Sequence, residues 1–581
     1  MSNAKTLECD VLIIGSGAGG GPLALELSRA GFEVIVLEKG PRHPREAYGR
    51  DEVEVTRRSF FAPKIDQDPH TVVTRGSPES RLTQLGWIAS CVGGGTAHMG
   101  AYLYRFHPDD FRMASRFGSP ADPSGVPLEL VDWPFGYDEL EPFYTKAEHE
   151  VGVSGLGGVN PFEGPRSGPY PMPPLDAHPV AELLEDAMRA RGGHPFPTPR
   201  AVTSRPYMGR PPCVYCEACA GYGCPVGARG SSQEALLPRA EATGRCRVLA
   251  DRMVRKISVD DRGRATGCEF FDPEGELRAV RAGVVCICCS AVESARLLLL
   301  SRSSRFPDGL ANGSSRVGRH LQFHAVSMGE GWIAKDRMAK DRMAKDRMAT
   351  DRMATDRMST DRMAREIANS QHPFLGRSMM DHYFLPDGVS ELPKGGLLRF
   401  FIQPPSPVAT AERFAFGQTP MLWGRGLQEA LGNHFQDGLS LGFEVFHDFL
   451  PNAETYVDLD PKVRDRWGLP VARIHLHVPE HHRRCGQWMM DRAFELLTDL
   501  GAERFVRHSV GGTSAYLVHG TCRAGDDPST SVLDRFCRTH EVENLYVVDG
   551  SFMPTSGGAS PTLTILANSF RVAEHLAKKL R

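Results

Sequence analysis

The order of apolar and polar positions predicts a strand, a helix and a second strand at the start of the chain. Residues 9–14 (CDVLII) form a short apolar run of the length of a buried strand. Residues 22–30 repeat apolar positions with helical spacing, and residues 32–37 (FEVIVL) form a second apolar run. Small residues fill positions 15–20 between the first run and the helix, which indicates a tight turn.

The other end of the chain carries a second set of regular elements. Residues 544–548 (NLYVV) are typical of a strand that ends in an acidic turn, and residues 563–580 predict a final helix. Segments 63–80 and 161–179 are rich in proline and glycine, so we expect them to be loops or linkers.

The turn at residues 15–20 (GSGAGG) has the form of a dinucleotide-binding fingerprint. Gly15 allows the tight turn, Gly17 lets backbone amides approach a pyrophosphate, and Gly20 lets the helix pack on the strand. Glu38 ends the second strand, 23 residues after Gly15, where a carboxylate can hold ribose hydroxyls. The motif with its flanking elements indicates a dinucleotide site, although it does not separate FAD from NAD. A glycine-rich turn without a ligand is the alternative.

Composition narrows the class of protein. The 581 residues contain 68 Lys and Arg against 71 Asp and Glu, and the net charge of −3 leaves no basic footprint for nucleic acid. There is no run of about 18 apolar residues, so we expect no transmembrane segment. The first ten residues lack the layout of a secretory signal. We therefore expect a cytoplasmic protein, or one exported with a partner subunit.

Several further blocks resemble the glucose–methanol–choline (GMC) oxidoreductase family of flavoproteins. The resemblance rests on the fingerprint and on four blocks in the family's order: residues 92–96 (VGGGT), Trp133-Pro134 with 137–144, 284–287 with 293–297, and the tail 520–564, which ends in PTLT. Residues 325–505 match the family poorly.

The resemblance implies an α/β fold with a Rossmann-like FAD-binding domain and an interleaved α+β substrate domain that carries an antiparallel sheet. The FAD-binding domain would combine residues 1–110, 235–325 and 510–581. The substrate domain would combine residues 111–234 and 326–509, and would include a cysteine-rich loop at 213–225.

The same resemblance implies which residues would contact FAD. Beyond the fingerprint glycines and Glu38, the loop around Gly94 would lie along the flavin and the Asp549 turn near the pyrophosphate and ribityl chain. His98 stands where some relatives attach FAD covalently and others do not. The remaining implied contacts are Thr96, Val254, Gly550, Pro561 and Thr562.

Four cysteines stand close together in the sequence, at Cys213, Cys216, Cys219 and Cys224. Their spacing, C-x2-C-x2-C-x4-C-P, is one residue longer than a bacterial ferredoxin run in its last gap. The block resembles that of gluconate, fructose and glucose dehydrogenase flavoproteins, some of which carry an iron–sulfur cluster. A cluster would pass single electrons to a partner such as a cytochrome. A structural zinc site, disulfides, or a loop without metal are the alternatives.

The expected catalytic pair departs from the family pattern. Members usually carry a histidine base three residues before the glycine of the Gly-Thr turn, and a His or Asn before the final Pro-Thr block. Here these positions hold Leu517 and Ser560, and leucine cannot accept a proton. His519, directly before Gly520, is our candidate base, with Ser560 as its companion. Alternatively, the base comes from another histidine, for which the candidates are His320, His324 and His508.

Residues 334–363 contain six copies of a five-residue unit, (Ala/Ser)-(Lys/Thr)-Asp-Arg-Met. A period of five turns about 140° further per unit on a helix, so the methionines build no single apolar stripe. We interpret the repeat as an insert at a surface loop, either a solvated helix or disorder. A methionine-rich cofactor or partner segment is the alternative.

Together these observations predict an FAD-dependent enzyme that oxidises a hydroxyl group of a sugar, polyol or metabolite and passes electrons to an acceptor other than oxygen. Because of Leu517 and Ser560, a flavoprotein of the same fold with altered chemistry (a reductase, a lyase or a redox-inactive protein) is the alternative.

Overall fold

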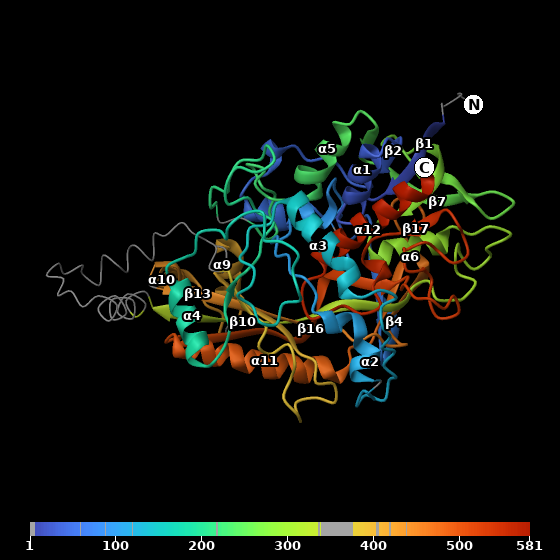
Figure 1. The fold of residues 1–581 in the computed structure, drawn as a ribbon. Coiled ribbons are helices and arrows are strands. Elements are labelled where there is room, and N and C mark those ends of the chain that lie inside the picture. Colours follow the sequence, from blue (N-terminus) through green and yellow to red (C-terminus); the bar gives the residue numbers. More distant parts are fainter. Residues whose placement is uncertain are drawn as a thin grey trace.

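The computed structural model describes residues 6–57, 60–87, 89–118, 120–216, 219–334, 337, 376–402, 406–417, 420–436 and 438–581. They form three β-sheets with helices packed around them (Figure 1). The predicted repeat at 334–363 lies outside the described residues, apart from Ala334 and Arg337.

The first sheet brings the two ends of the chain together. In it, β9 pairs in parallel with β1 on one side and with β17 on the other, so Val285 is the register partner of both Leu12 and Leu545. Where the three strands meet, residues 11–14, 284–287 and 545–547 are buried apolar runs, as strands covered on both faces require. Across the sheet the strands are β6 (Cys246–Leu249), β2 (Val34–Leu37), β1 (Leu7–Ile14), β9 (Leu277–Ile287), β8 (Ala265–Phe271) and β7 (Met253–Val259), with β17 (Leu545–Val547) also on β9.

The second sheet is antiparallel and has a helix layer on one face. Helix α11 (Glu480–Asp499) lies along it (Figure 1). The helix and the sheet bury a core that includes leucine, methionine and phenylalanine side chains. In order across the sheet, the strands are β16 (Arg504–Thr521), β10 (Arg319–Ala334), β13 (Gly438–His447), β12 (Gly396–Ile402), β11 (Arg377–Met379) and β5 (Phe196–Pro197).

The third sheet corrects one prediction. Its strands are β14 (Tyr456–Arg464), β15 (Pro470–Leu476), β3 (His70–Thr74) and β4 (Ser77–Thr83). Segment 63–80 was predicted to be a loop, but β3 and most of β4 fall within it. The β-branched residues of β3 pair in parallel with β15, about 400 residues further along the chain, a contact that local proline and glycine content does not reveal.

The helices near the chain ends match the predictions within two residues. Helix α1 (Gly20–Arg29) follows β1 directly, and α12 (Thr562–Leu580) packs beside it (Figure 1). None of the helices in the described ranges is long and apolar enough to span a bilayer. The other α-helices are α2 (Met113–Phe117), α3 (Tyr137–Val151), α4 (Val180–Ala190), α5 (Leu237–Glu241), α6 (Ala291–Leu300), α9 (Pro407–Phe416), α10 (Gly424–Gln436) and α11 (Glu480–Asp499).

Candidate functional site

The turn between β1 and α1 has the backbone geometry that its glycines predict. Gly15 has φ +97°, and a Cβ there would lie 2.3 Å from the carbonyl oxygen of Cys288. A Cβ at Gly20 would lie 2.0 Å from the Gly15 carbonyl oxygen, so helix and strand touch without a side chain between them. A Cβ at Gly17 would meet nothing closer than 3.8 Å, which leaves that side of the turn open to a ligand.

Glu38 lies where the sequence places it, at the end of β2 beside this turn. Its carboxylate accepts hydrogen bonds from Ser16 Oγ at 2.7 Å, from Ser16 N at 3.1 Å and from Gly40 N at 3.1 Å. Burial raises the pKa of Glu38, and these hydrogen bonds oppose the rise. The carboxylate therefore holds the turn in place through its hydrogen bonds with Ser16. The glycine pattern alone did not show this role of Ser16.

The Gly94 loop contacts the fingerprint turn directly. Ser16 Oγ accepts a hydrogen bond from Gly93 N at 2.9 Å, and Thr96 Oγ1 donates to the Gly93 carbonyl at 2.6 Å. Ser232, from the chain before α5, donates to the Ser16 carbonyl at 2.7 Å and to Thr96 Oγ1 through its amide at 2.9 Å. The structure therefore gathers residues 15–20, 93–96 and 232, which are far apart in the sequence.

The Asp549 turn closes the other side of this region. Its carboxylate accepts hydrogen bonds from Ser290 N at 2.9 Å and Ser551 N at 2.8 Å, and from the hydroxyls of Ser294 and Ser551. Burial raises the pKa of Asp549 against these bonds. A Cβ at Gly19 would lie 2.3 Å from the Val548 carbonyl oxygen, so the C-terminal turn rests against the fingerprint.

Three further predicted contacts lie at the margins of the same region. Val254 is buried in β7, two residues after Arg252, whose amide donates to the Glu38 carbonyl at 2.8 Å. Pro561 and Thr562 begin α12, and Ser569 of that helix donates to the Gly19 carbonyl at 2.5 Å.

The candidate base His519 is in the interior beside the Asp549 turn. It belongs to β16, opposite Gln322 of β10, and a Cβ at Gly550 would lie 3.7 Å from its Cδ2. The side chain is fully buried, neither ring nitrogen has a hydrogen-bond partner, and burial lowers its pKa to about 3. Such a ring is uncharged at neutral pH and keeps a free lone pair.

Of the three alternative histidines, the structure brings only His324 to His519. The two ring centroids are 5.9 Å apart, and His324 is likewise fully buried with both ring nitrogens unpartnered. His320 instead binds the Glu129 carboxylate. His508 lies near Glu330 with about a third of its side chain exposed, eleven residues from His519 along the same strand, roughly 35 Å at the usual rise.

Ser560 is engaged elsewhere. Its hydroxyl donates to the Tyr102 carbonyl at 3.1 Å, and Ser560 makes no hydrogen bond to His519. Leu517 packs against the main core, so the position at which the family resemblance predicts a base is apolar here.

Comparison with known proteins identifies the family. Models of the GMC oxidoreductase family match residues 132–326 and 451–569, and an FAD-binding domain model matches residues 10–50. The 6'''-hydroxyparomomycin C oxidase of Streptomyces lividus is 30% identical, and the match covers 98% of this chain and 92% of that protein. The chain belongs to the GMC oxidoreductase family.

Two more comparisons extend this result. The fructose dehydrogenase large subunit of Gluconobacter japonicus is 27% identical over the full length of both chains. The crystal structure of pyridoxine 4-oxidase from Mesorbium loti superimposes with a TM-score of 0.58 at 18% identity and covers 98% of this chain and 99% of that one, which shows the shared fold. The predicted α/β fold and the predicted flavin cofactor are confirmed for this GMC oxidoreductase.

The cysteine loop of this GMC oxidoreductase is tied to the segment that carries His98. Arg229 donates to the carbonyls of Ala97 at 2.5 Å, Tyr222 at 2.6 Å and Cys219 at 2.6 Å, and Gly221 N donates to the His98 carbonyl at 2.8 Å. The His98 ring stacks on Phe61 at 4.9 Å, and burial lowers its pKa to about 4.

The four loop cysteines are free thiols, and each is partly exposed. Within the described ranges, these four sulfurs do not form a set of ligand atoms within 4.8 Å of one another. The iron–sulfur cluster, like covalent flavin attachment at His98, therefore stays a prediction.

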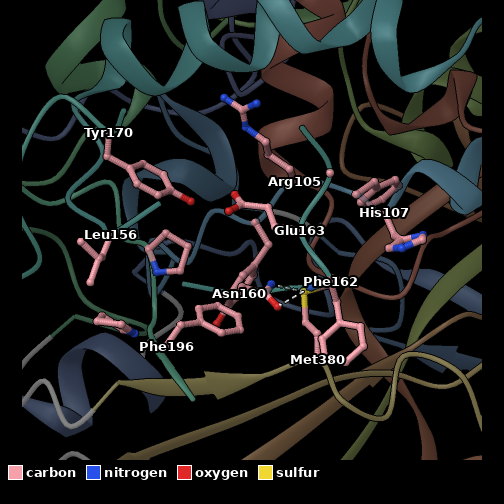
Figure 2. Close-up of a pocket in the computed structure, with 14 residues that line it drawn as sticks. Arg105, His107, Leu156, Asn160, Phe162, Glu163, Tyr170, Phe196 and Met380 are labelled. Carbon is pink, nitrogen blue, oxygen red and sulfur yellow. Dashed lines mark hydrogen bonds between the residues drawn. The ribbon is translucent and has the colours of Figure 1, made fainter. Parts of the chain in front are cut away.

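A small pocket lies apart from these predicted residues. Figure 2 shows it, lined by residues 104–107 and by parts of the loop 156–170, with Asn160 Nδ2 donating to Met380 Sδ at 3.0 Å. It holds about 20 Å³, room for about one water molecule, which is too little for a substrate. None of the sequence-predicted site residues lines it.

Proposed function

We propose that this enzyme oxidises a CH–OH group of a sugar, polyol or related metabolite, with hydride transfer to FAD, and hands the electrons to an acceptor other than oxygen. The observation that carries the proposal is the pair of fully buried, unpartnered imidazoles of His519 and His324 beside the Asp549 turn. Buried polar groups in native proteins are nearly always hydrogen-bonded, so such a pair calls for a polar ligand.

The residues of the glycine turns suit FAD. The open side of Gly17 and the start of α1 would hold the pyrophosphate, and Glu38 would face the ribose. When bound there, FAD supplies the acceptor for the hydride, while the protein supplies position and electrostatics.

The two histidines would divide the work on the substrate oxygen. We propose that His519 accepts the hydroxyl proton on a ring nitrogen and that a ring N–H of His324 hydrogen-bonds the same oxygen. Burial lowers the pKa of both rings, so both are neutral near pH 7 and each has a ring nitrogen with a free lone pair. In this proposal His324 takes the place that Ser560 would have, because the Ser560 hydroxyl already donates to Tyr102.

Two relatives support a hydroxyl-bearing substrate. One is named for fructose and the other for a hydroxyparomomycin, and both names describe oxidations. This agreement favours alcohol oxidation over the alternative of a reductase, a lyase or a redox-inactive protein.

The acceptor is proposed from the cysteine loop. Arg229 and Gly221 fasten this loop to residues 97 and 98, directly after the loop expected along the flavin. A cluster there would stand between the flavin and the surface, and a cytochrome-like partner would take the electrons. The relative named as a large subunit supports a multi-subunit assembly.

Anaerobic mixing with sugars and polyols tests the reaction. We expect at least one of them to bleach the flavin absorbance of the native enzyme. His519→Ala should lower the rate of this bleaching by about 10²–10⁴-fold, the usual contribution of a general base. His324→Ala should lower it less, because a hydrogen bond rather than proton removal is lost.

His508→Ala is the matched control, since it removes an imidazole from the same strand far from the pair. It should keep both flavin content and bleaching rate. Normal bleaching in His519→Ala with intact flavin would overturn the assignment of the base, and absence of bleaching by any alcohol would overturn the proposed reaction.

A further inference from the structure

Three metal-ligating side chains converge on the helix-covered face of the antiparallel sheet. His447 is the last residue of β13, and His481 and Cys485 lie one turn apart near the start of α11. Their ligand atoms all lie within 4.8 Å of one another, and the three side chains are 0–3% exposed. No step of the proposed reaction uses them.

The nitrogens of this trio lack the hydrogen bonds that buried imidazoles normally make. Neither ring nitrogen of His447 has a partner, and Nε2 of His481 has none. The other nitrogen of His481, Nδ1, lies 2.7 Å from Ser390 Oγ, which fixes the ring as the outer partners of metal-bound histidines do. The Cys485 thiol makes only long contacts of 3.8 Å, to the Lys394 carbonyl and to Met489 Sδ.

We propose that His447, His481 and Cys485 bind a zinc ion that fastens α11 to the end of β13. Two imidazoles and a thiolate are a donor set that suits Zn²⁺. Donor atoms around tetrahedral zinc are about 3.3–3.6 Å apart, so the separations within the trio need to shorten by about 1.5 Å at most. The Lys394 carbonyl, close to the thiol, or a water molecule would complete the tetrahedron.

The positive charge near the trio is paired with carboxyl groups. Lys394 is the nearby positive group, but its ammonium pairs with Asp110 at 3.0 Å and Asp448 at 2.9 Å, both buried. These two buried carboxyl groups offset the positive charge of the Lys394 ammonium.

The site is separate from the proposed reaction centre. His447 pairs across the sheet with Ala325, whereas His324 precedes Ala325 in β10. Successive strand residues point to opposite faces, so His447 faces α11 while His324 faces away from it. A metal here would act on stability rather than on the substrate.

Elemental analysis of the FAD-loaded enzyme, after exposure to zinc and dialysis, tests the inference. We expect about one zinc ion per chain to remain, and Cys485→Ser or His481→Ala to lose it. The matched control is Cys216→Ser, which removes a thiolate from the surface loop and leaves the trio intact. If Cys485→Ser keeps its flavin and still holds as much zinc as the native enzyme, the proposal is wrong.

If the Cys485 variant fails to fold, X-ray absorption at the zinc edge can identify the ligands of the bound zinc instead. In the Cys216→Ser enzyme we expect one sulfur at about 2.3 Å and two nitrogens at about 2.0–2.1 Å. A shell of sulfurs only would place the metal at another site. Either that result or the absence of bound zinc would overturn the inference. Neither readout depends on substrate turnover, so failure here and failure of the proposed oxidation are distinguishable.

Discussion

Two regions of this enzyme differ in whether their buried polar groups have hydrogen-bond partners: the cofactor region around the glycine fingerprint, and the histidine region in the antiparallel sheet. Around the fingerprint, the carboxylates of Glu38 and Asp549 are each satisfied by neighbouring amides and hydroxyls. In the antiparallel sheet, His324, His447 and His519 are buried with both ring nitrogens unpartnered. The polar groups of the first region are satisfied within the protein. Those of the second region lack partners, and we propose that a substrate or a metal supplies them.

The largest effect is expected from adding one methyl group at Gly15, in the cofactor region. In Gly15→Ala the new Cβ would lie 2.3 Å from the Cys288 carbonyl oxygen, and backbone cannot step aside as a flexible side chain can. We expect nearly complete loss of flavin absorbance in the purified protein.

The matched control for this change is Gly31→Ala. Gly31 has φ +99°, almost the same as Gly15, but a Cβ there would meet nothing within 4 Å. It carries the same backbone strain without the clash, so it should keep its flavin. Equal flavin loss in both variants would show that strain, and not the packing of the turn on β9, decides binding.

A smaller effect is expected at the cysteine loop. Cys216→Ser should remove iron from the purified enzyme and slow turnover with one-electron acceptors, because a cluster would lose a thiolate ligand. Anaerobic flavin reduction by substrate should be unchanged, since it precedes that step. Iron content equal to that of the native enzyme would rule out the cluster, and slower flavin reduction would mean that the loop shapes the substrate site.

The smallest expected effect is on the pH dependence of stability. The pKa of His519 is about 3 in the folded protein and about 6.5 in the unfolded chain, so the unfolded state binds the extra proton between these values. Stability from the neutral ring is therefore full above pH 6.5 and is lost as pH falls toward 3, by about 1.4 kcal/mol per pH unit.

Urea unfolding at pH 6.5, 5.5 and 4.5 measures this slope. His519→Gln should reduce it by about 1.4 kcal/mol per pH unit, and the surface variant His508→Gln should leave it unchanged. An unaltered slope in His519→Gln would mean that the ring already has a polar partner, and the contrast between the two regions would weaken.

Much of the cofactor site was predictable because its information is local. The spacing of Gly15, Gly17 and Gly20 indicates where the turn has no room for a side chain. Glu38 follows after the length of one helix and one strand. Ser16 and Ser232 were not predicted, because serine is common in turns. Only the folded chain shows that Ser16 binds Glu38 and that Ser232 binds the Ser16 carbonyl.

The histidine sites were only partly predictable. His519 and His324 were candidates among several, and nothing in their spacing distinguished them from His320 or His508. The strand pairing of β10 with β16 made the selection. The His447 trio gave no signal beyond the helical spacing of His481 and Cys485, because its third member comes from another strand.

By itself, the sequence determined the βαβ opening and the glycine turn of a dinucleotide site, because steric limits on a backbone turn act between neighbours in the chain. The flavin followed only from the resemblance of the other blocks to the GMC family. The tertiary structure decided which imidazoles meet and which lose their water. That choice depends on the register between strands hundreds of residues apart, and only the packed sheets and α11 set it.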